Sequence, residues 1–116
     1  MPKIEFINEL IALGYNPVEP DSSKIYFEYV VPVGPNIGKK ILVGFEIGNN
    51  FPASCPSGPH FKSIGIEGWK EPSQNIHDSP FGPGWRYWSR PFPDWNRCKK
   101  TVKVYLAHIK NLLVKL

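Results

Sequence analysis

The side chains best suited to chemistry lie in the last third of the chain, around a single thiol. Cys98 stands between Arg97 and the pair Lys99 and Lys100. Neighbouring cations and a helix N-terminus both stabilise a thiolate, which is the nucleophilic form of cysteine. If a helix instead begins near Trp95, Cys98 falls on its apolar stripe and packs as a small core residue. The sequence leaves the nucleophilic and the structural interpretation of Cys98 open.

Two further groups could take part in acid–base or nucleophilic chemistry. Asp78 follows His77 in the segment NIHDSPFGPGW, and an adjacent carboxylate can orient an imidazole for proton transfer. Ser89 offers a hydroxyl, although no glycine elbow surrounds it. An exposed loop histidine and a turn serine are the simpler interpretations of these residues. His108, inside a helical pattern, and Cys55, in a proline-rich loop, are interpreted as packing residues.

The stretch PGWRYWSRPFPDWNRC, residues 83–98, concentrates aromatic and basic side chains. Its tryptophans and arginines could bind a partner, and the residues concerned are Trp85, Arg86, Trp88, Arg90, Trp95 and Arg97. In one interpretation they form an exposed aromatic surface that stacks on glycan, peptide or single-stranded nucleic acid. The prolines and glycines nearby favour the other, in which the rings fix an extended crossover against a sheet.

Motifs of the common cofactor and metal sites are absent from the sequence. The segment VGPNIGKK lacks the glycine spacing of a phosphate-binding loop and joins two strand-like runs rather than opening a helix. The cysteines and histidines lack the short CxxC or HxxxH spacing of a zinc site, and they are Cys55, His60, His77, Cys98 and His108. We therefore expect neither a cofactor nor a metal.

The 116 residues are enough for one domain, spanning residues 1–116, with its own core. Aromatic residues make up 14% of the chain and 13 residues are proline, which indicates a folded chain with long, proline-rigid connections. The net charge of +4 includes no run of five basic residues, so a nucleic-acid partner is not expected. The sequence shows no membrane span and no signal peptide. We therefore expect a cytoplasmic protein with free thiols and no membrane partner.

Hydrophobic periodicity predicts a helix near each end of the chain. Pro2 suits the first turn of the first helix and Gly14 ends it. Its expected apolar stripe consists of Ile4, Ile7, Leu10 and Ile11, widened by Phe6 and Leu13. The segment TVKVYLAHIKNLLVKL has similar spacing, and its expected buried face consists of Val102, Tyr105, Leu106, Ile109, Leu112, Leu113 and Leu116.

Alternation of apolar and polar side chains predicts strands between these helices. The runs KIYFEYVVP and KKILVGFEIG alternate and flank a short turn, as in an antiparallel hairpin. Their expected inward side chains are Ile25, Phe27, Tyr29, Ile41, Val43, Phe45 and Ile47. Residues 60–66 are expected to form a third strand, whereas residues 67–94 show no clear period and are expected to form a long crossover. The prediction is an α+β fold, a meander sheet with the last helix packed on one face.

This order of elements resembles that of the ubiquitin-conjugating (UBC) superfamily. Its members run from a helix through a four-stranded meander and an irregular active-site stretch to a helix packed on the sheet. FPASCPSGPHF, residues 51–61, is similar to the family's tyrosine–proline segment, and His77 follows it as does the histidine of the family's His-Pro-Asn motif. DWNRCKKTVKVYLAHIKNLL is similar to the family's tryptophan and following helix. Together with GWRYWSRPFPDW, it resembles small bacterial members encoded beside ubiquitin-like proteins, often in phage-defence loci.

The resemblance implies acyl transfer, in which an activating enzyme hands over the C-terminal glycine of a ubiquitin-like protein for transfer to a protein target. In the family a cysteine about ten residues after the histidine carries this modifier as a thioester. Here that zone reads GWRYWSR, and Asp78 and Ser79 follow His77, so the motif's asparagine is missing. Cys98 could carry the modifier while His77 and Asp78 act on the incoming nucleophile, or a hydroxyl such as Ser89 could do so. The third alternative is a non-catalytic adaptor that binds the modifier.

Overall fold

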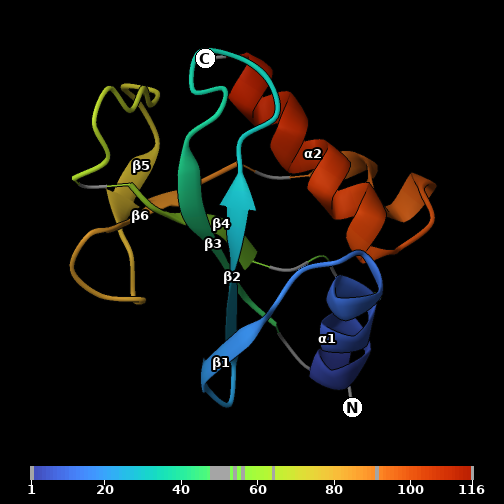
Figure 1. Ribbon diagram of the computed structural model, residues 1–116. Coiled ribbons are helices and arrows are strands. Elements are labelled where there is room, and N and C mark those ends of the chain that lie inside the picture. Colours follow the sequence, from blue (N-terminus) through green and yellow to red (C-terminus); the bar gives the residue numbers. More distant parts are fainter. Residues whose placement is uncertain are drawn as a thin grey trace.

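Two α-helices cover one face of a six-stranded antiparallel sheet (Figure 1). The computed structural model describes residues 2–47, 53, 55, 57–63, 65–90 and 92–115. The helices are α1 (Pro2–Ala12), the short 3-10 helix η1 (Pro93–Arg97) and α2 (Val102–Val114). The strands are β1 (Val18–Asp21), β2 (Lys24–Val30), β3 (Lys40–Glu46), β4 (Ser57–Lys62), β5 (Ile76–Asp78) and β6 (Trp85–Trp88). The predicted α+β architecture is confirmed.

The sheet has the strand order β1-β2-β3-β4-β6-β5, and its first four strands form a meander. The predicted hairpin is formed by β2 and β3, which pair Lys24 with Glu46 at one end and Val30 with Lys40 at the other. The side chains predicted to point inward are all buried, and they are Ile25, Phe27, Tyr29, Ile41, Val43, Phe45 and Ile47. The alternation of apolar and polar residues along β2 and β3 therefore predicted the side chains that the sheet contributes to the core.

Helix α1 has the predicted extent, and the predicted stripe is confirmed for Phe6, Ile7 and Leu10 but not for Ile4 and Ile11. Phe6 and Leu10 are fully buried, whereas Ile4 is 51% exposed and Ile11 is 57% exposed. The ring of Phe6 lies 5.3 Å from the ring of Phe45 on β3, so the sheet meets the side of α1 that carries Phe6. The predicted stripe through Ile4 and Ile11 is wrong because these residues lie beside this contact rather than in it.

The third predicted strand corresponds to β4, but β4 lies nearer the N-terminus than predicted. It starts at Ser57 rather than at His60 and ends at Lys62. Of the segment 51–61, which carries part of the resemblance to the UBC superfamily, residues 51, 52, 54 and 56 lie outside the described residues. Cys55 is half-buried against the core, and burial raises the pKa of its thiol.

A hairpin of β5 and β6 occupies the region that the sequence predicted to be a crossover without strands. It pairs Ile76 with Trp88 and Asp78 with Arg86, and β6 in turn pairs with β4. The prediction was wrong because strands of three and four residues are too short to show a period of two. The hairpin extends the sheet beyond β4 (Figure 1).

Helix α2 begins where the sequence supplies a cap. Thr101 is the N-cap, and its hydroxyl accepts a hydrogen bond from the N–H of Val104 at 3.2 Å. The predicted inner face is confirmed for its buried members, which are Val102, Tyr105, Ile109 and Leu113. Leu106 and Leu112 are half-buried, and Leu116 lies outside the described residues. No helix in the described part of the chain is long and apolar enough to cross a membrane.

A carboxylate from α1 completes the N-terminus of α2. Oε1 of Glu9 accepts hydrogen bonds from the backbone N–H groups of Val102 at 2.8 Å and of Lys103 at 3.4 Å. The first N–H groups of a helix have no partner within the helix, and the positive end of its dipole favours an anion. Glu9 therefore joins the first helix of the chain directly to the last.

Replacing Glu9 by alanine should lower the free energy of unfolding by about 1 to 2 kcal/mol, because two N–H groups lose a charged acceptor. Urea denaturation followed by circular dichroism measures this change. Glu5→Ala is the matched control, since Glu5 is a carboxylate in the first turn of α1, and it should cost about 0.5 kcal/mol or less. Equal losses for the two variants would contradict a capping role for Glu9.

Candidate functional site

The structure separates the predicted thiol from the other predicted site residues. Cys98 is exposed and directly follows η1, with its N–H donating to the carbonyl of Trp95 at 3.3 Å, and Arg97 beside it is also exposed. Because α2 begins only at Val102, Cys98 lies before its N-cap and off its apolar stripe, so the interpretation of Cys98 as a core residue is wrong. The nucleophilic interpretation stays a prediction. His77 lies on β5, on the opposite side of the molecule from the start of α2 (Figure 1).

His77 and Asp78 do not form a pair. Neighbouring side chains on a strand point to opposite faces, and these two diverge in that way on β5. The ring of His77 lies 6.1 Å from the ring of Tyr87, whereas Oδ1 of Asp78 lies 3.5 Å from Nη1 of Arg86. Nε of Arg86 also lies 3.4 Å from a carboxylate oxygen of Glu71. The predicted orientation of His77 by Asp78 is therefore wrong.

Ser89 and Arg90 fasten the segment that leads into β5. The guanidinium of Arg90 donates to the carbonyl oxygens of Gln74 at 3.1 Å, of Asn75 at 3.3 Å and of Ser89 at 3.0 Å. The N–H of Ser89 donates to the carbonyl of Asn75 at 3.0 Å. These contacts give both residues a structural role at the end of the hairpin.

The tryptophans of residues 83–98 are buried. Their exposed fractions are 8% for Trp85, 0% for Trp88 and 3% for Trp95. Trp88 contacts Phe61 with ring centroids 4.6 Å apart, and Trp95 lies 6.2 Å from Tyr105. The rings of Trp88 and Trp95 have almost no exposed surface on which a ligand could stack, whereas Trp85 still lines two pockets. The three residues therefore form no shared aromatic platform. Trp85 and Trp88 instead belong to β6, a strand of the sheet, and Trp95 of η1 packs in the core.

Three polar side chains from separate parts of the sequence meet on the face of the sheet that the helices leave uncovered. They are Glu46 at the end of β3, His60 on β4 and Ser79 immediately after β5. Glu46 and His60 point to this face because they alternate with Phe45 and Phe61, which point into the core. We call Glu46, His60 and Ser79 the outer-face cluster.

The two ring nitrogens of His60 have different surroundings. Nδ1 lies 2.8 Å from Oγ of Ser79, and Nε2 lies 3.5 Å from Oε1 of Glu46. Oγ of Ser79 also accepts the N–H of Phe81 at 3.1 Å. The contact with Glu46 is not a hydrogen bond, and within the described residues Nε2 has no hydrogen-bond partner. Because the negative charge of Glu46 favours a proton on the nitrogen that faces it, we assign the ring proton to Nε2. Nδ1 then accepts the hydroxyl proton of Ser79.

Aromatic rings seal the imidazole of His60 from solvent. The side chain is 1% exposed, and its ring centroid lies 4.8 Å from those of both Phe81 and Tyr87. Burial, together with the positive charge of Lys24, lowers the pKa of His60 to about 4. The ring is therefore neutral at pH 7, and the lone pair of Nδ1 remains available to Ser79.

The loop between β5 and β6, residues 79–84, folds back over the outer face of the sheet. A Cβ atom at Gly44 would lie 2.7 Å from the ring of Phe81, so only glycine leaves room for this ring. Phe81 also lies 4.8 Å from Trp85, whose ring is 5.7 Å from that of Tyr26. The absence of a side chain at Gly44 thus lets the loop close over His60.

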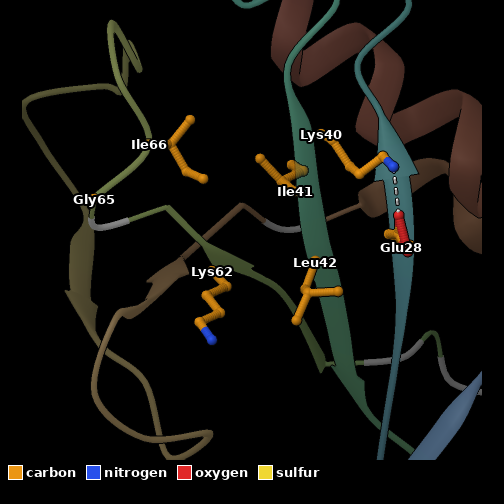
Figure 2. A pocket seen from close by; sticks show the side chains of 7 residues that line it. All are labelled: Glu28, Lys40, Ile41, Leu42, Lys62, Gly65 and Ile66. Carbon is orange, nitrogen blue, oxygen red and sulfur yellow. Dashed lines mark ion pairs between the residues drawn. The ribbon is translucent and has the colours of Figure 1, made fainter.

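Two adjoining pockets hollow the outer face. The first has a volume of about 340 Å³, and Figure 2 shows its lining residues, which are Glu28, Lys40, Ile41, Leu42, Lys62, Gly65 and Ile66. An ion pair of 2.9 Å between Lys40 and Glu28 borders this pocket. The second pocket, of about 300 Å³, shares Leu42 and Lys62 with the first and reaches Phe81 and Trp85. The outer face is therefore grooved from β2 to the loop of residues 79–84.

Sequence reasoning missed the outer-face cluster as a functional group. His60 and Ser79 are 19 residues apart, and only the β4–β6–β5 pairing brings them together. A polar residue that alternates with Phe61 carries no special signal, because outward positions of a half-covered strand are ordinarily polar. Within the described residues, no three histidine, cysteine, aspartate or glutamate side chains gather as a metal site.

The buried neutral state of His60 should make stability depend on pH. The unfolded chain binds a proton near the ordinary pKa of 6.5, whereas folded His60 binds one only near pH 4. The contribution of neutral His60 is therefore complete above pH 6.5 and is lost as the pH falls from 6.5 to about 4. At about 1.4 kcal/mol per pKa unit, the loss is about 3 kcal/mol.

Urea denaturation between pH 7.5 and pH 4 measures this loss. His60→Gln should be less stable at pH 7.5 but should lose about 3 kcal/mol less than the wild type over the same window. His77→Gln, at an exposed histidine, is the control and should follow the wild-type profile. A wild-type pH dependence retained in His60→Gln would contradict the assignment to His60.

Comparison with protein-family models, with curated proteins and with solved structures gives no match for this chain. No family or activity is therefore assigned by similarity. The function proposed below depends on the order of the elements, the positions of the thiols and the geometry around His77 and Ser79.

Proposed function

We propose that this chain is a UBC-like protein of a bacterial ubiquitin-like modification pathway, which binds the C-terminal tail of the modifier and does not carry it as a cysteine thioester. The order of the elements supports the first part of this proposal. Helix α1, the meander β1 to β4 and helix α2 follow one another as the resemblance to the UBC superfamily implies. The β5–β6 hairpin stands between β4 and α2, where that superfamily has its irregular active-site stretch.

The residue opposite His77 supports the second part and is the single observation that carries the proposal. The resemblance implies a carrier cysteine about ten residues after the histidine, and Tyr87 is at that distance from His77. The two are direct cross-strand partners in β5 and β6. A phenol therefore occupies the position that the resemblance gives to the thiol. The ring of Tyr87 is also stacked on His60, which holds it in place.

Neither thiol of the described chain is placed to take over that role. Cys98 directly follows η1 and is not part of the β5–β6 hairpin. Cys55 is half-buried, and burial raises the pKa of its thiol, which disfavours the reactive thiolate. These placements favour a protein that binds the modifier over one that carries it on cysteine.

The surface beside the hairpin can accept an extended tail that ends in glycine. A pocket of about 470 Å³, which we call the hairpin pocket, is lined by Asp78, Ser79, Gly82, Pro83, Gly84 and Trp85. Its two glycines carry no side chains, so another backbone can approach closely.

Binding of a modifier is tested by calorimetric titration with a panel of bacterial ubiquitin-like proteins that end in glycine. We expect at least one to bind, and removal of its last residues should abolish the binding. Binding by none of the panel, or binding that survives removal of the tail, would overturn the proposal.

Transfer is tested by adding the activating enzyme of the bound modifier and ATP, followed by electrophoresis with and without reductant. The wild type, Cys98→Ala and the matched control Cys55→Ala should all lack a reductant-sensitive adduct, because Tyr87 occupies the carrier position. The wild type could instead form an adduct that reductant removes and that Cys98→Ala does not form. This result would show a thioester on Cys98 and would overturn this part of the proposal.

A further inference from the structure

We propose that Ser79 is a nucleophile that accepts acyl groups from activated esters and thioesters, with His60 as its base and Glu46 as the residue that positions His60. This inference deepens the proposed function, because it names the side chain that would receive the acyl group of the modifier. The nucleophile itself is defined by the outer-face cluster and can be tested with a small acyl donor.

The hydroxyl of Ser79 is held in the arrangement that a nucleophile requires. Its proton points to Nδ1 of His60, 2.8 Å away, and one oxygen lone pair accepts the N–H of Phe81 at 3.1 Å. A hydroxyl oxygen has two lone pairs, so the second remains for attack on a carbonyl carbon. The N–H of Phe81 therefore fixes the direction of the hydroxyl without using up its nucleophilic electrons.

The other nitrogen of His60 faces Glu46. Nε2 lies 3.5 Å from Oε1 of Glu46 without a hydrogen bond, and the ring is stacked on Tyr87 and tilted against Phe81. When Nδ1 takes the proton of Ser79, the positive charge that forms on the ring faces this carboxylate. A carboxylate has the same positioning and charge-stabilising role in Ser-His-Asp triads.

An acyl donor can reach Ser79 from the hairpin pocket. Ser79 is half-buried and lines this pocket of about 470 Å³ together with Gly82, Gly84 and Trp85. Ser89, the hydroxyl that the sequence singled out, differs in this respect. Within the described residues it makes no hydrogen bond to a histidine, and its N–H is tied to Asn75.

The chemistry is an ordinary acyl transfer and needs no oxidant or cofactor. Oγ of Ser79 attacks the carbonyl carbon of the donor while its proton passes to Nδ1 of His60. The bond from that carbon to the leaving oxygen or sulfur then breaks, and His60 returns the proton to the departing alcohol or thiol. The products are an oxyester on Ser79 and a free alcohol or thiol.

The test uses p-nitrophenyl acetate as the donor and maps the acetylated residue of the intact chain by mass spectrometry. We expect one acetyl group on Ser79, removed by hydroxylamine because it is an ester. Ser79→Ala should lose this adduct, and His60→Gln should slow its formation by about 100-fold or more. Ser89→Ala is the matched control and should be acetylated at the wild-type rate.

Glu46→Gln is a second variant, for use if Ser79→Ala or His60→Gln does not fold. The side chain of Glu46 is 38% exposed, so its replacement by glutamine should leave the protein folded. This variant should slow acetylation of Ser79 by about tenfold or more while the thermal unfolding profile stays cooperative. Acetylation of Tyr87 or of lysines in place of Ser79 would overturn the proposal. Acetylation of Ser79 at the wild-type rate in folded His60→Gln would also overturn it.

The outcome can be separated from that of the proposed function. If Ser79 is acetylated but the protein binds no ubiquitin-like modifier, the assignment of Ser79 as a nucleophile is supported and the proposed function is wrong. Binding of a modifier without acetylation of Ser79 would retain the proposed function and reject the nucleophile.

Discussion

The rest of the structure depends on the contact that the ring of Phe45 makes between the sheet and the two α-helices. This ring lies 5.3 Å from Phe6 of α1 and 5.1 Å from Tyr105 of α2, so both helices meet the sheet at one residue of β3. Burial of this aromatic contact fixes which face of β3 points inward. Gly44 and Glu46 on either side of Phe45 must then point outward. The position of a carboxylate on the uncovered face thus follows from packing on the covered one.

The outer face is closed by aromatic side chains rather than by a helix. Phe81 and Tyr87 bury a histidine there, and a buried imidazole is costly unless both of its nitrogens meet polar partners. Ser79 is such a partner at Nδ1, whereas Nε2 makes no hydrogen bond within the described residues and lies 3.5 Å from Oε1 of Glu46. The burial of Nε2 therefore carries a cost in stability, and the same arrangement places the ring between a hydroxyl and a carboxylate, as a base requires. Structural and chemical roles of the outer-face cluster are therefore not exclusive.

The sequence predicted what long periodic runs can encode. Both helices, the β2–β3 hairpin and the inward side chains around Phe45 follow from periods of 3.6 and 2. The β5–β6 hairpin is too short to show a period, and its glycines and prolines suggested an irregular crossover. The outer-face cluster depends on the pairing of that hairpin with β4, so no local pattern could reveal it. For the same reason, His77 and Asp78 look like a pair in the sequence but face opposite ways on β5.

The bond between Glu9 and Val102 spans 93 positions of the sequence and closes almost the entire chain into a loop. A contact of such sequence separation forms late, because the entropy of closing the loop is repaid only once the sheet between the helices has assembled. During synthesis α1 emerges long before its partner exists. The last helix therefore receives its anionic cap only after the chain from Glu9 to Lys103 has been synthesised, and this couples the folding of α1 to that of α2.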